Sequence, residues 1–216
     1  MIQTSQIQVC QLTNPTPEEK ATCLEIYTEA FKNDPLQVRL CGEDLTIHKL
    51  FHMAKLEPAF IDCQVWVARI DGQIGCVATI AQPGKDLWDT EEKKVYMQKA
   101  LDSVNEDTRR WYSKAFGPLA AKKALAIPGG ATATYYIQGI ASLSTFQGQG
   151  LASAILADLT ALATKEGKSL SLLTMSDKAV RLYRRNGFEI TYEDTLPINE
   201  EIGDAPYYIM VGTSSG

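Results

Sequence analysis

The chain has 216 residues, 45% of them hydrophobic, which is enough for one well-buried core. Its 26 acidic side chains outnumber 21 basic ones, and the net charge of -5 argues against nonspecific binding to nucleic acid. No apolar run approaches the roughly 18 residues that a membrane span needs. No segment is typical of a linker between independent domains, so residues 1–216 are expected to form a single domain.

Cysteine usage indicates a reducing compartment. The chain has five cysteines, an odd number, and their separation in the sequence matches no pattern of metal ligands. The N-terminus has no basic segment followed by an apolar run, as a secretory signal would have. We therefore expect an intracellular, cytoplasmic protein. The cysteines are Cys10, Cys23, Cys41, Cys63 and Cys76.

The first predicted helix begins at Thr16–Glu19, where a threonine cap precedes a proline at the first helical position and an acid at the third. Apolar residues then recur at helical spacing, at Leu24, Tyr27 and Phe31. Asn33–Pro35 is predicted to end this helix.

A second helix is predicted over Leu45–Lys55, where Leu45, His48 and His52 are spaced to share one face. No third ligand accompanies the two histidines at a recognisable spacing. We therefore expect no metal here and a structural or exposed role for both histidines.

An antiparallel hairpin follows. Residues in Gln64–Ile70 alternate between apolar and polar, and Gln73–Ala81 resumes β-branched and apolar residues. Between the two runs stands Asp71-Gly72, which is a strong signal for a two-residue hairpin turn.

The next segment, about 84–130, is predicted to be a helical insert. Helices are expected over Leu87–Ser103 and Thr108–Ala126, with Gly117-Pro118 interrupting the second one. Two roles are open for the insert: it walls a substrate pocket, or it packs on the sheet without touching substrate.

The C-terminal half alternates strands and helices, and its last helix is expected to end at Asn186-Gly187. Strands next to helices predict a mixed α/β fold in which helices cover both faces of a central sheet. The expected elements are a strand at Ala133–Leu143, a helix from Gly150 to Glu166-Gly167, a strand at Leu170–Met175, a helix from Ser176, strands at Phe188–Tyr192 and Tyr207–Val211, and a loose tail at Gly212–Gly216.

A glycine-rich turn between the strand at Ala133–Leu143 and the following helix is suited to hold an anion. Gly148 and Gly150 carry no Cβ, so backbone N–H groups can converge there on phosphate oxygens. The first turn of the helix adds unpaired donors and the positive end of its dipole. Two other phosphate-binding motifs fit this turn poorly. A dinucleotide-binding motif needs Gly or Ala at the position that Ser153 occupies, and a P-loop needs a Lys-Ser or Lys-Thr pair after Gly150, which is absent.

Two motifs resemble those of the GNAT superfamily of acyl-CoA-dependent N-acyltransferases. Motif A of that family reads Arg or Gln, two residues, Gly, one residue, then Gly or Ala, and here it is Gln147, Gly150 and Ala152. Motif B follows in the family's order and spacing, with Ser176 where Asn is usual, and the clear resemblance covers roughly Thr134–Phe188. Motif B keeps Ala179, Leu182, Tyr183, Gly187 and Phe188.

The resemblance implies a GNAT-like central sheet with the helical insert between the hairpin and the motif A strand. It also implies acetyl-CoA as co-substrate and an N-acetyltransferase that acts on a primary amine by direct attack in a ternary complex. Tyr183 occupies the family's general-acid position, although a structural role in the core is an alternative. The residues expected to bind the cofactor are Ile140, Ala141, Ser142, Gln147, Gly148, Gln149, Gly150, Leu151, Ala152, Ser176 and Ala179.

A general base is not assigned. Many family members carry Glu on the motif A strand, but this strand has Gln138, which cannot usefully take a proton. A catalytically silent acyl-CoA-binding or scaffold protein is therefore the alternative function. The expected partner is a small-molecule or peptide amine. Binding to nucleic acid or to a membrane is not expected, and whether the chain forms a homodimer is left open. Four acids remain as candidate bases or as solvated surface groups: Glu29, Asp34, Glu193 and Asp204.

Overall fold

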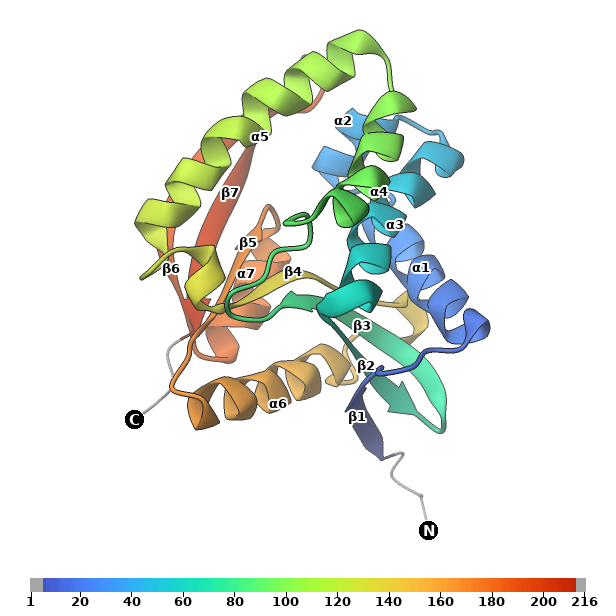
Figure 1. The fold of residues 1–216 in the computed structure, drawn as a ribbon, viewed down its shortest axis with the longest axis vertical. Helices are drawn as coiled ribbons and strands as arrows, with labels where there is room; N and C mark the ends of the chain where they lie inside the picture. Colours follow the sequence, from blue (N-terminus) through green and yellow to red (C-terminus); the bar gives the residue numbers. More distant parts are fainter. Residues whose placement is uncertain (1–5, 213–216) are drawn as a thin grey trace.

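The computed structural model describes residues 6–212, apart from the side chain of Ala120. Seven strands form one sheet in the order β1-β2-β3-β4-β5-β7-β6 (Figure 1). β4 and β5 run parallel, and the other neighbouring pairs are antiparallel. The strands are β1 (Ile7–Gln11), β2 (Gln64–Ile70), β3 (Gln73–Ala81), β4 (Tyr135–Ser142), β5 (Leu170–Thr174), β6 (Phe188–Asn199) and β7 (Gly203–Gly212).

Helices cover both faces of this sheet, as the sequence predicted, and the fold class is confirmed. Short 3-10 turns at Ala131–Ala133 and Ser144–Phe146 flank β4. The helices are α1 (Pro17–Phe31), α2 (Pro35–Cys41), α3 (Leu45–Asp62), α4 (Glu91–Asp102), α5 (Glu106–Ala126), α6 (Leu151–Lys165) and α7 (Asp177–Arg185).

Side chains at the helix starts explain where several helices begin. Thr16 and Glu19 form a reciprocal capping box at α1. Ser176 caps α7 by accepting a hydrogen bond from the backbone N–H of Ala179 at 3.3 Å. In the predicted hairpin turn, Asp71 has φ 50° and Gly72 has φ 79°, as a type I′ turn requires.

Two apolar layers hold the helices on the sheet. α6 and α7 pack on one face, where Leu159 and Val180 join a cluster with Ile137. α1 and α3 pack on the other face, where Ile26 lies in a cluster with Val77. Alternate residues of the central strands therefore point into different layers, which is why those strands have few polar residues.

The predicted helical insert consists of α4 and α5. α4 packs beside α3, and α5 extends along β6 and β7 on the other side of the molecule (Figure 1). The indole N–H of Trp111 donates a hydrogen bond to the carbonyl of Pro197 at 2.7 Å, and Lys122 Nζ lies 2.6 Å from Asp194 Oδ2. The insert therefore connects the two halves of the fold above β4 and β5.

Several predicted boundaries were wrong. Gly117-Pro118 does not interrupt α5, because both residues are exposed and the carbonyl left unpaired by Pro118 can be solvated. α4 begins at Glu91 rather than Leu87, because Thr90 caps it. α3 continues past Lys55 to Asp62 with Pro58 inside it, and β6 and β7 are longer than predicted.

Other differences concern single elements. β1 and α2 were not predicted, and Leu45 is 62% exposed rather than facing the core with the histidines. Gly212 ends β7, whereas residues 213–216 of the expected tail lie outside the described residues.

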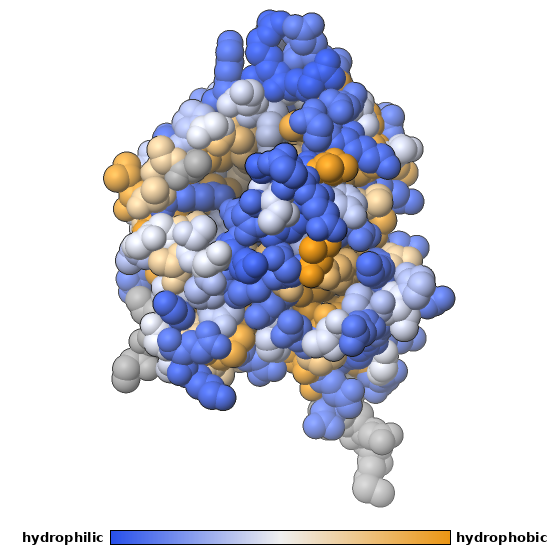
Figure 2. Space-filling view, in the orientation of Figure 1, coloured by the Kyte–Doolittle hydropathy of each residue, from blue (hydrophilic) through white to orange (hydrophobic). Residues whose placement is uncertain are grey.

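The surface is mostly polar on the face seen in Figure 2, where apolar residues lie in small separate groups. Within residues 6–212 no helix is both long enough and apolar enough to cross a membrane.

Candidate active site

The candidate site lies where β4 and β5 diverge. The parallel pairing joins Tyr135–Ile137 to Leu170–Leu172 and extends no further. Beyond it β4 pairs with β3 alone, with a bulge that leaves Gln138 without a partner in the register, and the end of β5 pairs with β7. The gap exposes backbone groups of β4 between the two strands.

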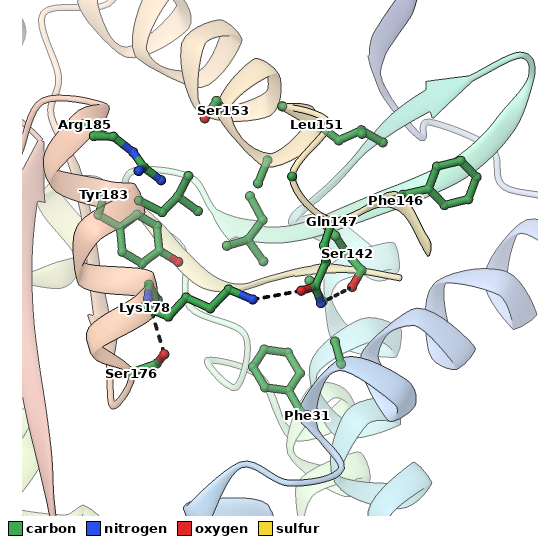
Figure 3. Close-up of a pocket in the computed structure, with 18 residues that line it drawn as sticks. Phe31, Ser142, Phe146, Gln147, Leu151, Ser153, Ser176, Lys178, Tyr183 and Arg185 are labelled. Atoms are coloured by element: carbon green, nitrogen blue, oxygen red, sulfur yellow. Dashed lines mark hydrogen bonds between the residues drawn. The ribbon is translucent and has the colours of Figure 1, made fainter. Parts of the chain in front are cut away.

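A cavity of about 590 Å³ opens at this gap. Its walls come from the end of α1, β4, the loop before α6, the first turn of α6, and α7 (Figure 3). We call it the β4–α6 cavity. All the residues that the sequence singled out for cofactor binding line it except Gln149, whose side chain instead donates to the Thr145 carbonyl at 3.0 Å. The lining residues predicted from the sequence are Ile140, Ala141, Ser142, Gln147, Gly148, Gly150, Leu151, Ala152, Ser176 and Ala179.

The loop before α6 has the geometry of an anion site. Gly148 has φ 78° and Gly150 has φ 88°, both in the left-handed region that favours glycine. Gly150 is the N-cap of α6 and supplies no side-chain acceptor, so the first N–H groups of this helix stay available for a ligand. The loop and the start of α6 also lie against β3, because a Cβ on Gly75 would stand 2.8 Å from Phe146 Cγ and 2.7 Å from Leu151 Cδ2.

A buried tyrosine supports β4 from behind. The hydroxyl of Tyr27 donates a hydrogen bond to the Gly139 carbonyl at 2.9 Å and shares another with Thr79 Oγ1 at 2.8 Å. A Cβ on Gly139 would stand 2.8 Å from that hydroxyl, so glycine is needed there. This contact fixes the backbone beside the divergent part of β4.

Two cations on α7 line the β4–α6 cavity and were not predicted. Lys178 Nζ donates to Gln147 Oε1 at 2.9 Å, and Gln147 Nε2 donates to the Ser142 carbonyl at 3.4 Å (Figure 3). Arg185 lies on the same wall. Lys178 and Arg185 are seven residues apart, a spacing that places both on one helix face, and this signal could have found them.

Tyr183 lies at the back of the cavity with its hydroxyl toward the interior (Figure 3). The residue is only 5% exposed, and no group in residues 6–212 forms a hydrogen bond with its hydroxyl. Burial raises the pKa of this phenol, so it stays protonated at neutral pH. A hydroxyl that is protonated, unpaired and at a cavity wall is available as a proton donor, whereas a structural hydroxyl would have a partner.

A second cavity, of about 530 Å³, adjoins the first. We call it the insert cavity, because α4 and α5 contribute Met97, Phe116 and Leu119 to its wall. Its lining is rich in aromatic rings. The residues that line both cavities are Ala30, Phe31, Ile140, Ser176, Ala179 and Tyr183.

The four candidate bases lie in different places. Glu29 accepts hydrogen bonds from the backbone and hydroxyl of Ser144, which lower the pKa of its carboxyl. Glu193 and Asp204 are exposed on β6 and β7 and line neither cavity. Asp34 lines the insert cavity, and Gln138 also lines it.

The two histidines of α3 form a buried pair. His52 Nε2 lies 3.4 Å from His48 Nε2, and the rings meet edge to face. Burial lowers the pKa of both, that of His52 to about 2, so both are neutral at pH 7. Neither lines a cavity described above, and the described residues hold no group of three or more potential metal ligands.

Comparisons with known proteins agree with this geometry. Residues 120–190 match the family model described as an acetyltransferase (GNAT) domain. A search of curated proteins finds no match.

Solved structures share the fold over nearly the whole chain. A Corynebacterium glutamicum protein described as histone acetyltransferase HPA2 and related acetyltransferase is 21% identical, with a TM-score of 0.65 and coverage of 99% of this chain and 98% of that one. Arylalkylamine N-acetyltransferase 2 from Aedes aegypti is 17% identical, with a TM-score of 0.62 and coverage of 96% and 99%.

The Drosophila melanogaster polyamine N-acetyltransferase, which forms N-acetylagmatine, is 13% identical, with a TM-score of 0.65 and coverage of 95% and 99%. At these identities the likeness shows the fold. Together with the family model over residues 120–190 it agrees with the resemblance drawn from the two motifs: this part of the chain matches a GNAT acetyltransferase domain.

Proposed function

We propose that the chain is an N-acetyltransferase that transfers the acetyl group of acetyl-CoA to a primary amine by direct attack in a ternary complex. The observation that carries this proposal is that Tyr183 lies on the wall shared by both cavities. A thioester in the β4–α6 cavity would be reached by an amine from the insert cavity. Holding both reactants at this junction contributes mainly by orientation.

The β4–α6 cavity fits the cofactor. Its pyrophosphate would lie against the N–H groups of the loop at Gly148 and Gly150 and the first turn of α6, with Lys178 and Arg185 as cationic partners. The pantetheine arm would run along the unpaired edge of β4 at Ile140–Ser142, where a backbone N–H would stabilise the oxyanion. Leu151, Ala152, Ser176 and Ala179 complete this proposed binding site.

The chemistry then needs a proton for the leaving group. As the amine attacks, the carbon–sulfur bond breaks, and the thiolate of CoA takes a proton from the Tyr183 hydroxyl. A thiolate whose conjugate acid has a pKa near ~8.5, by analogy with cysteine, leaves more readily when protonated. The amine loses its proton to a base or to water, so the protons balance.

One observation favours the alternative of a silent acyl-CoA-binding protein: Gln138 lines the insert cavity where many family members carry a Glu. Turnover of acetyl-CoA with amines, polyamines, amino acids and peptides, measured as release of the CoA thiol, distinguishes the two functions. The proposal predicts amine-dependent release with at least one acceptor class. Tight CoA binding without amine-dependent release across the panel would contradict it.

A further inference from the structure

The charges of the insert cavity are few and unequal. Asp34, Lys55 and Lys123 are the charged residues among the described residues that line it, so the cavity carries one negative and two positive groups. Polyamines and simple arylalkylamines are cationic at neutral pH and would bring further positive charge to this wall. An acceptor that also carries an anionic group fits the charge balance better.

Lys55 is the cation best placed to bind an anion. It projects from α3, and its Nζ lies 5.6 Å from the centroid of the Phe31 ring. Within the part of the chain that the structure describes, its ammonium has no ion pair and no hydrogen bond. Burial lowers the pKa of this amine, which indicates an ammonium that has lost water and gained no full partner.

Asp34 lies near Lys55 but does not pair with it. Its Oδ1 accepts the backbone N–H groups of Leu36 and Gln37, at 3.0 and 3.2 Å, as the cap of α2. Burial raises the pKa of this carboxyl, and the charge of Lys55 opposes the rise. Two opposite charges thus face one cavity, close enough to interact electrostatically but outside ion-pair distance, and a zwitterion can fit between them.

Most of the remaining wall is apolar and aromatic, and its polar residues are Asn33, Gln37, Gln138, Thr174 and Ser176. The rings come from α1, α3, the segment before α4, α5, β4 and α7, so a large apolar group would be enclosed from several sides. Lys123 Nζ already lies over one of these rings, 4.5 Å from the centroid of Tyr136. The rings are those of Phe31, Phe51, Trp88, Tyr112, Phe116, Tyr136 and Tyr183.

From these observations we infer that the acceptor is a free α-amino acid with a large apolar side chain. Its carboxylate pairs with Lys55, its ammonium lies against Asp34, and its side chain packs among the aromatic rings. Phe31, beneath Lys55, lines both cavities, so an amine held beside it lies at the junction with the β4–α6 cavity.

This inference rests on the proposed acetyl transfer and gives it a proton acceptor. The ammonium of the amino acid gives one proton to the Asp34 carboxylate and becomes a neutral amine. That amine forms the carbon–nitrogen bond as the carbon–sulfur bond breaks, and its second proton goes to water. The thiolate takes its proton from Tyr183, so one proton is released overall. The product is an N-acetyl amino acid.

Binding to the CoA-loaded protein tests the inference without requiring turnover. Calorimetry compares L-phenylalanine with phenethylamine, which lacks only the carboxylate, and with 3-phenylpropionate, which lacks only the amine. We expect L-phenylalanine to bind at least tenfold more tightly than either, a difference of about 1.4 kcal/mol. Phenethylamine binding as tightly as L-phenylalanine would overturn the inference, and so would the absence of binding by L-phenylalanine, L-leucine and L-methionine.

Variants locate the carboxylate. Lys55→Met is expected to reduce the preference for L-phenylalanine over phenethylamine to less than about threefold, since the charge-assisted hydrogen bond is gone. Lys49→Met, on the exposed face of the same helix, is the matched control and should keep the preference. A preference that survives in Lys55→Met, or that is lost in Lys123→Met instead, contradicts the assignment to Lys55.

Turnover separates this inference from the proposed function. Thiol release with phenethylamine but not with amino acids would leave the acetyltransferase standing and remove the amino-acid assignment. Tight, Lys55-dependent binding of amino acids without any thiol release would contradict the acetyltransferase and leave the amino-acid site standing.

Discussion

Lys178 on α7 donates a hydrogen bond at 2.9 Å to Oε1 of Gln147 in the loop before α6. The two residues belong to the two motifs, which the sequence separates by a helix and a strand and which the fold brings together at one cavity. An exposed ammonium held at the edge of an anion-binding loop is well placed to exchange its amide partner for a phosphate.

Removing this ammonium is expected to weaken the binding of CoA. Lys178→Met should raise the dissociation constant by about fivefold, less than a buried charge-assisted hydrogen bond would give, because the side chain is exposed and screened by salt. Arg181→Met removes a cation from the same helix outside the cavity and serves as control. Equal losses in the two variants, measured by calorimetry, would indicate a general charge effect rather than a contact.

The loop itself is tested by a pair of substitutions at Gly150. Any side chain there is strained by the φ of 88°, but asparagine tolerates this conformation and matches aspartate in shape. Gly150→Asp should therefore bind CoA more than about tenfold more weakly than Gly150→Asn, since only the aspartate adds negative charge. Indistinguishable affinities for CoA, in proteins with normal circular dichroism, would contradict the assignment of the pyrophosphate to this loop.

A third prediction concerns the insert. Lys93 on α4 is fully buried and lies 2.6 Å from Asp62 Oδ1 and 2.5 Å from Asp89 Oδ1, so it fixes α4 to the end of α3. Lys93→Met should lower the free energy of unfolding by about 2 kcal/mol, because two carboxylates lose their buried partner. Lys94→Met, which removes an exposed pair with Glu91, should change it little.

The same cluster predicts a dependence on pH. Hydrogen bonds from Lys85 and then Lys93 lower the pKa of Asp62. Burial acts to lower the pKa of Lys93, but its hydrogen bonds to Asp62 and Asp89 outweigh burial and leave the pKa raised. The carboxylate contribution is present above the unfolded value of ~3.9 and is lost as the pH falls through the lowered pKa.

The lysine contribution has the opposite sign. It is present below the unfolded value of ~10.4 and is lost as the pH rises through the raised pKa. Urea unfolding of the wild type and Lys93→Met should therefore differ most between about pH 4 and pH 10. A difference that stays constant down to about pH 2 would show that Lys93 acts by packing alone.

Much of the fold was predictable because the C-terminal half gives strong local signals. The glycines at 148 and 150, the apolar stripe of α6 and the order of the two motifs indicate the right elements in the right sequence. α2 was missed because the signals that end one helix and begin the next coincide. Asp34-Pro35 prevents α1 from continuing, and in the same pair Asp34 caps α2 and Pro35 is its first residue.

The candidate site was predicted only where it follows a motif. Tyr183 and the cofactor residues other than Gln149 line a cavity as expected, whereas their roles in binding and catalysis stay predictions. Lys55 gave no signal, because a lysine on an amphipathic helix is ordinarily solvated. Lys55 becomes a candidate binding residue only in the tertiary structure, where elements far apart in the sequence form the insert cavity around it.

The most direct test of the proposed mechanism is kcat of Tyr183→Phe beside Tyr135→Phe. Tyr135 is a matched control, because its ring is also buried but its hydroxyl donates a structural hydrogen bond to Glu166 at 2.6 Å. If Tyr183 protonates the leaving thiolate, Tyr183→Phe should lose about 10²-fold in kcat with little change in acetyl-CoA affinity or thermal stability. Tyr135→Phe should keep kcat and lose about 1 kcal/mol of stability. A Tyr183→Phe enzyme that turns over like the wild type would contradict the account and leave Tyr183 as packing.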